Sequence, residues 1–118
     1  MELLSVKPEL YDRLTINPDQ LEEFCQQQHI IELALFGSVL RDDFRPDSDI
    51  DILITFTPNV KRSLIDLVDM QYELEELSHR SVDLLTKKSV INSANWIRRN
   101  EILNTAKIIY ESRSSLLA

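Results

Sequence analysis

The sequence predicts a small α/β fold in which helices pack against a mixed sheet of about four strands. Two observations predict this class. Short apolar stretches of strand length alternate along the chain with longer segments in which apolar residues recur every three or four positions. The length of 118 residues and the hydrophobic content of 43% fit one compact domain with a modest core.

We therefore expect residues 1–118 to form a single domain whose two ends follow no clear pattern. Residues 1–16 are ambiguous and could form an N-terminal arm; within them, residues 8–14 could be either a short helix or part of a docking arm. Residues 112–118 are interpreted as a loose C-terminal tail. No apolar segment approaches the ~20 residues that a membrane span requires, so we expect no membrane contact.

The first clear helix is predicted over residues 18–28, because Asn17 is a favourable N-cap residue and Pro18 suits the first helical position. Ile30–Phe36 follows as the first strand. Its nearly continuous apolar character indicates burial on both faces of the sheet.

A turn at Gly37 follows this strand, and we expect a short helix anchored by Val39 and Leu40. Residues 42–48 then form a loop, and the second strand is predicted over residues 49–57. The remaining elements are a helix capped by Ser63 and ending near Ser78, a third strand over residues 81–86, a last helix beginning at Asn92 or Asn95 and ending near Thr105, and a short edge strand over residues 107–111.

Two features of these helices bear on function. The acidic residues of the long helix are interpreted as a solvated face; they are Asp66, Asp69, Glu73, Glu75 and Glu76. On the last helix, Trp96 is interpreted as a core or interface residue rather than a nucleotide-stacking platform. Arg98 and Arg99 are expected on the polar side of that helix.

Gly37 is the only glycine in the chain, and it lies where the first strand stops. Glycine permits a positive φ and leaves room for a ligand to contact the backbone. A helix start directly after Gly37 would direct free N–H groups outward, which is a favourable arrangement for binding an anion. Gly37 and Ser38 are therefore candidate phosphate-binding residues.

Asp49 and Asp51 lie at the start of the second strand, and ten residues separate Ser38 from Asp49. Because side chains alternate between the faces of a strand, the two carboxylates should point the same way, about 7 Å apart. Two neighbouring carboxylates repel each other unless a cation lies between them. A phosphate-binding turn facing a carboxylate pair suggests a site for a nucleotide and a divalent metal.

Asp83 lies in the apolar third strand, where a carboxylate requires an explanation. One interpretation is a strand-edge aspartate that is hydrogen-bonded to a neighbouring loop. The other, which we favour, places Asp83 beside Asp49 and Asp51 on an adjacent strand.

The pattern Gly37-Ser38, ten residues, Asp49-Ile50-Asp51 resembles the motif of the DNA polymerase β-like nucleotidyltransferase superfamily. The whole chain resembles a minimal nucleotidyltransferase (MNT), the antitoxin of HEPN–MNT toxin–antitoxin pairs. One residue departs from the pattern: the position after Arg41, commonly glycine in such proteins, is Asp42 here.

The resemblance implies a role for each motif residue. Gly37 and Ser38 would hold the β and γ phosphates of ATP, and Arg41 would help to neutralise phosphate charge. Three aspartates would bind two Mg²⁺ ions, and the one on the third strand would also accept a proton from the acceptor hydroxyl; they are Asp49, Asp51 and Asp83.

The implied reaction is the transfer of AMP from ATP to a hydroxyl, with a tyrosine of a cognate HEPN ribonuclease toxin as the acceptor. The modified toxin would be neutralised, and a hetero-oligomer with the toxin is expected. Two alternatives remain: a non-catalytic antitoxin that neutralises its partner by binding, and a nucleotidyltransferase acting on a small-molecule acceptor. The second is disfavoured because the chain has no residues to spare for an acceptor-binding domain.

The composition limits which binding partners and which cellular compartment we expect. The net charge of −7 argues against direct nucleic-acid binding, which requires basic patches to neutralise phosphates. Cys25 is the only cysteine, so no intramolecular disulfide can form. A reducing cytoplasm is therefore the expected location.

Overall fold

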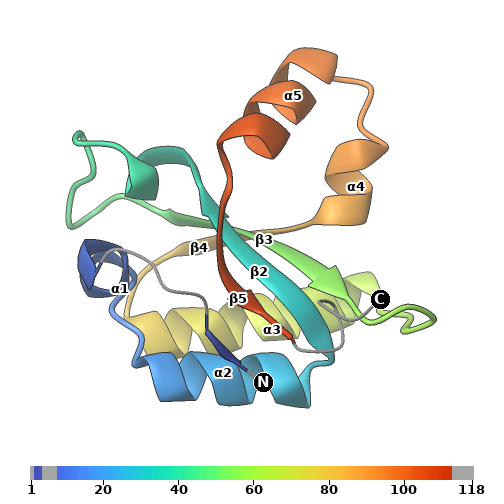
Figure 1. Cartoon of the computed structure of the whole chain (residues 1–118), viewed down its shortest axis with the longest axis horizontal. Helices are drawn as coiled ribbons and strands as arrows, with labels where there is room; N and C mark the ends of the chain where they lie inside the picture. Colours follow the sequence, from blue (N-terminus) through green and yellow to red (C-terminus); the bar gives the residue numbers. More distant parts are fainter. Residues whose placement is uncertain (1, 4–7, 113–118) are drawn as a thin grey trace.

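The computed structural model describes residues 2–3 and 8–112 and contains a five-stranded sheet in the order β1-β5-β2-β3-β4 (Figure 1). Within these residues no helix is both long enough and apolar enough to cross a membrane. The elements are β1 (Glu2–Leu3), α1 (Pro8–Leu14), α2 (Pro18–Gln27), β2 (Ile30–Phe36), the 3₁₀ turn η1 (Gly37–Leu40), β3 (Ile50–Phe56), α3 (Leu64–Ser78), β4 (Val82–Thr86), α4 (Lys87–Ile91), α5 (Trp96–Thr105) and β5 (Lys107–Glu111).

The sheet is mixed, as the sequence predicts. Strand β2 pairs antiparallel with β3 on one side and with β5 on the other, whereas β3 and β4 are parallel. In Figure 1, α2 and α3 lie against one face of this sheet, and α4 and α5 lie at the other. The predicted α/β class is therefore confirmed.

Two apolar clusters fill the two faces of the sheet. The larger cluster joins α1, α2 and α3 to the residues of β2 and β3 that face them, such as Leu33, Leu35 and Ile52. The smaller one contains Ala34, Phe36, Leu53, Val90 and Ile102. Strand β2 contributes to both clusters, which explains its nearly continuous apolar sequence and confirms its predicted burial on both faces.

Most predicted boundaries agree with the structure to within two residues. Asn17, Ser63 and Asn95 act as helix N-caps, and Ser63 forms a capping box with Asp66. Residues 8–14 form a helix that places Leu10 and Leu14 in the core, so this part of the chain is not an arm. Part of the predicted arm and most of the predicted tail lie outside the described residues, namely residues 1, 4–7 and 113–118.

Four expectations require correction. The short helix expected after Gly37 is a 3₁₀ turn, and β3 begins at Ile50, so Asp49 precedes it. Residues 107–111 form an inner strand, because β1 pairs along its outer side. The sequence analysis also missed α4, a five-residue helix capped by the Thr86 side chain, because so short an element shows no periodicity.

Strand β4 forms one edge of the sheet, beside β3, and α3 protects its exposed backbone. The Glu75 carboxylate accepts a hydrogen bond from the Val82 N–H at 2.9 Å, and the Gln71 side chain accepts one from the Leu84 N–H at 3.4 Å. Glu75 is thus not merely part of a solvated face. Occupied N–H groups make this edge a poor template for pairing with another chain, and they fix α3 against the strand that carries Asp83.

Candidate active site

A cavity of about 410 Å³ lies where β2 ends and β3 begins, and it is walled by η1 and α5. This volume falls within the usual range for small-molecule sites. Its lining residues are Phe36, Gly37, Ser38, Arg41, Ser48, Asp49, Asp51, Arg98, Glu101, Ile102 and Thr105. The cavity therefore contains all of the predicted site residues except Asp83.

Gly37 shapes the cavity floor through its backbone. It has a φ of 75°, in the left-handed region where side chains are strained. In addition, Phe36 pairs with Asp51 across the strands, which brings the Asp51 carboxylate against Gly37. A Cβ atom at position 37 would overlap Asp51 Oδ2 and lie 3.1 Å from its Cγ. Only glycine fits both the conformation and the space.

Asp51 is the central acidic residue. Asp83 lies directly beside it, because the parallel register of β3 and β4 pairs the two residues and same-register side chains share a face. Burial, together with the charges of Asp83 and Asp49, raises the pKa of Asp51 from 3.8 to about 6, although Arg98 and Arg41 partly offset this effect. The structure thus brings the three predicted carboxylates within electrostatic reach, with Asp83 outside the cavity lining.

The carboxylates of the cavity can supply part of the ligand set of a divalent cation. The described residues contain no group of three or more His, Cys, Asp or Glu side chains arranged to hold a metal ion. Asp49 and Asp51 nevertheless present carboxylate oxygens to one cavity. Mg²⁺ typically binds one or two carboxylates and completes its shell with water and substrate phosphates, which matches this donor set.

Arg41 lies at the end of η1 and lines the same cavity. Its Nε donates to Asp43 Oδ1 at 3.2 Å, and both side chains are more than half exposed. Exposed ion pairs contribute little, about 0–1 kcal/mol, so Arg41 can exchange Asp43 for a phosphate. Asp42 makes no hydrogen bond or ion pair through its side chain in the described structure.

Two arginines hold the loop between η1 and β3 by donating to its backbone. Arg13 donates to the carbonyls of Val39 and Arg41, and Arg80 donates to those of Arg45 and Ser48, at 2.6–2.9 Å. Both guanidinium groups also lie over the Phe44 ring, at 5.6 and 4.4 Å from its centre. These contacts join α1 and the start of β4 to the loop, and they fix where Asp49 enters the site.

Residues 18–112 match the model of the nucleotidyltransferase domain. The chain belongs to this family. It is 42% identical over 73 residues to a Methanocaldococcus jannaschii protein classed with the protein adenylyltransferases, a match that covers 62% of the chain and 72% of that protein. It is 32% identical over 90 residues to the protein adenylyltransferase MntA of Thermococcus cleftensis, covering 76% and 85%.

Solved structures agree with this assignment. A protein described as a minimal nucleotidyltransferase superposes on 75% of this chain and 84% of its own, with a TM-score of 0.57 and 28% identity. A toxin–antitoxin structure with AMP-PNP matches with a TM-score of 0.65 over 84% of this chain and 77% of that chain. Its identity of 18% supports the shared fold alone.

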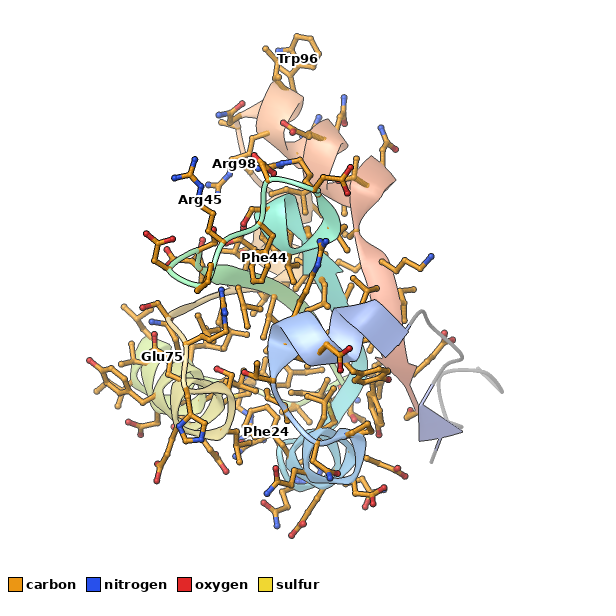
Figure 2. The ribbon with its side chains drawn as sticks, turned by 90° about the vertical axis from the view of Figure 1, so that its left-hand side faces the viewer. Phe24, Phe44, Arg45, Glu75, Trp96 and Arg98 are labelled. Carbon is orange, nitrogen blue, oxygen red and sulfur yellow. The ribbon has the colours of Figure 1, made fainter. Side chains whose placement is uncertain are left out.

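The sequence analysis missed the wall that α5 contributes to this nucleotidyltransferase site. Arg98, Glu101 and Thr105 share one helix face through their spacing of three and four residues. That spacing is visible in the sequence, but nothing local indicates which end of the sheet the helix covers. The sequence predicts Trp96 in the core or at an interface; the core role is wrong, because the residue is 60% exposed, and the interface role stays a prediction. In Figure 2 Trp96 points outward at the far end of α5.

We expect Gly37→Ala to damage this site severely. The added Cβ must displace Asp51, and a non-glycine residue in the left-handed region costs ~1–2 kcal/mol. Thermal unfolding should report a loss of stability, and calorimetry with ATP should report a loss of binding. Ala34→Gly, in the same strand pair, provides a control that weakens β2 without touching the cavity. ATP binding by Gly37→Ala equal to that of the unmodified protein would contradict this account.

Proposed function

We propose that this nucleotidyltransferase is an antitoxin that transfers AMP from ATP to a tyrosine hydroxyl of a cognate HEPN ribonuclease toxin and thereby neutralises it. The observation that carries this proposal is the single cavity in which the Gly37–Ser38 turn faces Asp49 and Asp51. A turn that accepts phosphate and a carboxylate pair that accepts a cation are the two parts required to bind a nucleoside triphosphate with its metal.

Each residue has a defined part in the proposed reaction. Gly37 and Ser38 bind the β and γ phosphates, through backbone N–H groups and the serine hydroxyl, and Arg41 adds positive charge beside them. The acceptor oxygen forms a bond to the α-phosphorus while the bond from that phosphorus to the bridging oxygen breaks. Pyrophosphate leaves with that oxygen, and Asp83 accepts the proton of the hydroxyl.

Asp49 and Asp51 would hold Mg²⁺, with Asp83 as the third carboxylate on the acceptor side. When bound, the metal supplies positive charge that offsets the charge on the attacking and leaving oxygens. It would also relieve the repulsion from Asp83 and Asp49, which adds to burial in raising the pKa of Asp51. We therefore propose that ATP binding and transfer depend on a divalent cation.

Relatives support a protein acceptor. The M. jannaschii and T. cleftensis proteins named above are both described as protein adenylyltransferases. A structural neighbour from Shewanella oneidensis is a tri-AMPylated HEPN toxin in complex with an MNT antitoxin; it matches with a TM-score of 0.58 and 15% identity. We extend these descriptions to this chain and propose a hetero-oligomer with the toxin. We separately propose a cytoplasmic location, because Cys25 is the only cysteine in the sequence.

The proposal requires a HEPN ribonuclease to be encoded beside this protein. It is tested by incubating the two proteins with radiolabelled ATP and Mg²⁺. We expect AMP to be attached to the HEPN protein, pyrophosphate to be released, and ribonuclease activity to fall in proportion. EDTA should prevent both labelling and ATP binding. Tight ATP binding in EDTA would contradict metal dependence, and inhibition without any labelling would contradict adenylyl transfer.

That second outcome corresponds to the alternative of inhibition by binding alone. One observation favours inhibition by binding alone: the Asp43 carboxylate forms an ion pair with Arg41, whose guanidinium should be available to phosphate. Asp43→Asn separates the two ideas, because releasing Arg41 should strengthen ATP binding a few-fold if the site works as proposed. An absence of ATP binding by both the unmodified protein and Asp43→Asn would favour the binding-only interpretation.

A further inference from the structure

Arg98 lies in the first turn of α5 and lines the active-site cavity together with Gly37, Ser38 and Asp51. In Figure 2 it lies on the side of α5 that faces the rest of the molecule, whereas Trp96 points away. Its backbone N–H is bound to the Asn95 cap, which fixes the start of the helix and therefore the origin of the side chain. Arg98 thus reaches the cavity from a different element than the motif residues.

The guanidinium of Arg98 has no hydrogen bond or ion pair within the described part of the chain. Several other arginines are committed: Arg13, Arg62 and Arg80 donate to backbone carbonyls of distant segments. The neighbouring Arg99 donates to the Ser93 carbonyl at 3.2 Å and does not line the active-site cavity. Arg98 is therefore available to a ligand in a way that these arginines are not.

Offsetting the charge of Asp51 does not by itself account for Arg98. The two side chains do not form an ion pair, although Arg98 lies close enough to lower the pKa of the Asp51 carboxyl. Once a divalent cation occupies the aspartates, a further positive charge nearby is repelled. A polyanion in the same cavity reverses this balance, because phosphate oxygens can accept two parallel hydrogen bonds from one guanidinium.

We propose that Arg98 binds the triphosphate of the nucleotide from the α5 wall and works with Arg41 on the η1 wall. This inference rests on the proposed function only in taking a nucleoside triphosphate as the ligand. It gives α5 a direct part in substrate binding and assigns a ligand to an arginine outside the Gly-Ser and Asp-x-Asp motif. Because Arg98 is exposed, its replacement should leave the fold unchanged.

The test is calorimetry with Mg²⁺-ATP, Mg²⁺-tripolyphosphate and adenosine on Arg98→Gln and on the unmodified protein, without any acceptor present. We expect Arg98→Gln to lower the affinity for both polyphosphates roughly ten- to a hundredfold, the effect of losing a charge-assisted hydrogen bond. Adenosine binding should be unchanged. Arg98→Lys keeps the charge but loses the planar fork. Its polyphosphate affinity should lie between those of Arg98→Gln and the unmodified protein.

Two matched variants remove the same charge elsewhere. Arg99→Gln changes the adjacent residue of α5, and Lys61→Gln changes an exposed residue before α3; neither should alter polyphosphate affinity more than about twofold. The inference is overturned if Arg98→Gln binds ATP within twofold of the unmodified protein, or if Arg99→Gln loses as much affinity. Thermal unfolding identifies a misfolded variant, in which case Arg98→Lys decides.

The readout also separates this inference from the proposed function. Polyphosphate binding that depends on Arg98, in a protein that labels no acceptor, would uphold the inference while refuting adenylyl transfer. Labelling and ATP affinity that are both unaffected by Arg98→Gln would uphold transfer while refuting the inference.

Discussion

Asp49→Asn combined with Asp51→Asn is expected to abolish AMP transfer, with a loss of more than about a thousandfold. In the proposed reaction the two carboxylates would hold the cation in the cavity that they line, and a catalytic metal contributes several kcal/mol of charge stabilisation in the transition state. Labelling of the HEPN protein from radiolabelled ATP provides the measurement. Asp47→Asn, an exposed residue of the same loop that does not line the cavity, is the matched control.

The same substitutions should not destabilise the protein. Since the pKa of Asp51 is raised from 3.8 to about 6, the folded protein binds this proton more tightly than the unfolded chain does. Ionised Asp51 therefore lowers stability above about pH 6, and this penalty disappears as the pH falls from about 6 to about 4. Without metal near pH 7.5, the free energy of unfolding of Asp51→Asn should exceed that of the unmodified protein by roughly 1 kcal/mol after solvent screening.

Chemical denaturation at pH 7.5 and pH 4 measures this difference, which should vanish at the lower pH. A variant less stable than the unmodified protein at pH 7.5 would show that Asp51 makes a favourable structural contact instead. A double variant that still labels its partner would remove the pair from the catalytic site. One that labels nothing but still inhibits the ribonuclease would favour neutralisation by binding.

The second large effect is expected for Asp83→Asn, which should slow AMP transfer by ~10²–10⁴-fold, the contribution of a positioned general base. A tyrosine acceptor makes this group necessary, because its hydroxyl has a reference pKa near 10 and is almost fully protonated at neutral pH. ATP affinity should change much less, since Asp83 lies outside the lining of the cavity in which we propose that the triphosphate binds.

The measurement is therefore paired: ATP affinity by calorimetry and transfer rate by labelling, for Asp83→Asn beside the unmodified protein. Asp69→Asn, which removes an exposed carboxylate from α3, controls for the change in net charge. If Asp83 were only a strand aspartate, the amide could keep its local hydrogen bonds and transfer would stay within roughly tenfold. Loss of ATP binding together with a lowered melting temperature would make its role structural.

Much of the site could be predicted from the sequence because its key signals are local. A lone glycine after an apolar strand predicts a special backbone conformation, and the φ of 75° at Gly37 agrees. Alternation in β3 separates the buried Ile50, Ile52 and Ile54 from Asp51 on the other face. Helix caps at Asn17 and Ser63 follow from side-chain chemistry within three residues of each helix start.

The remaining features depend on contacts between distant segments. Asp83 lies beside Asp51 because β4 pairs parallel with β3 in one particular register, which α3 and its hydrogen bonds to the β4 edge help to fix. The loop before Asp49 is held by Arg13 and Arg80 from elsewhere in the chain. None of these pairings leaves a periodic trace in the sequence.

The sequence by itself determined the fold class, the special backbone conformation at Gly37 and the acidic pair, because backbone conformation and strand alternation are properties of neighbouring residues. Only the tertiary structure decided that Asp83 joins that pair and that α5 brings Arg98 to the cavity. The physical reason is that strand register and helix placement follow from how the apolar faces of the whole chain pack together, which no local segment specifies.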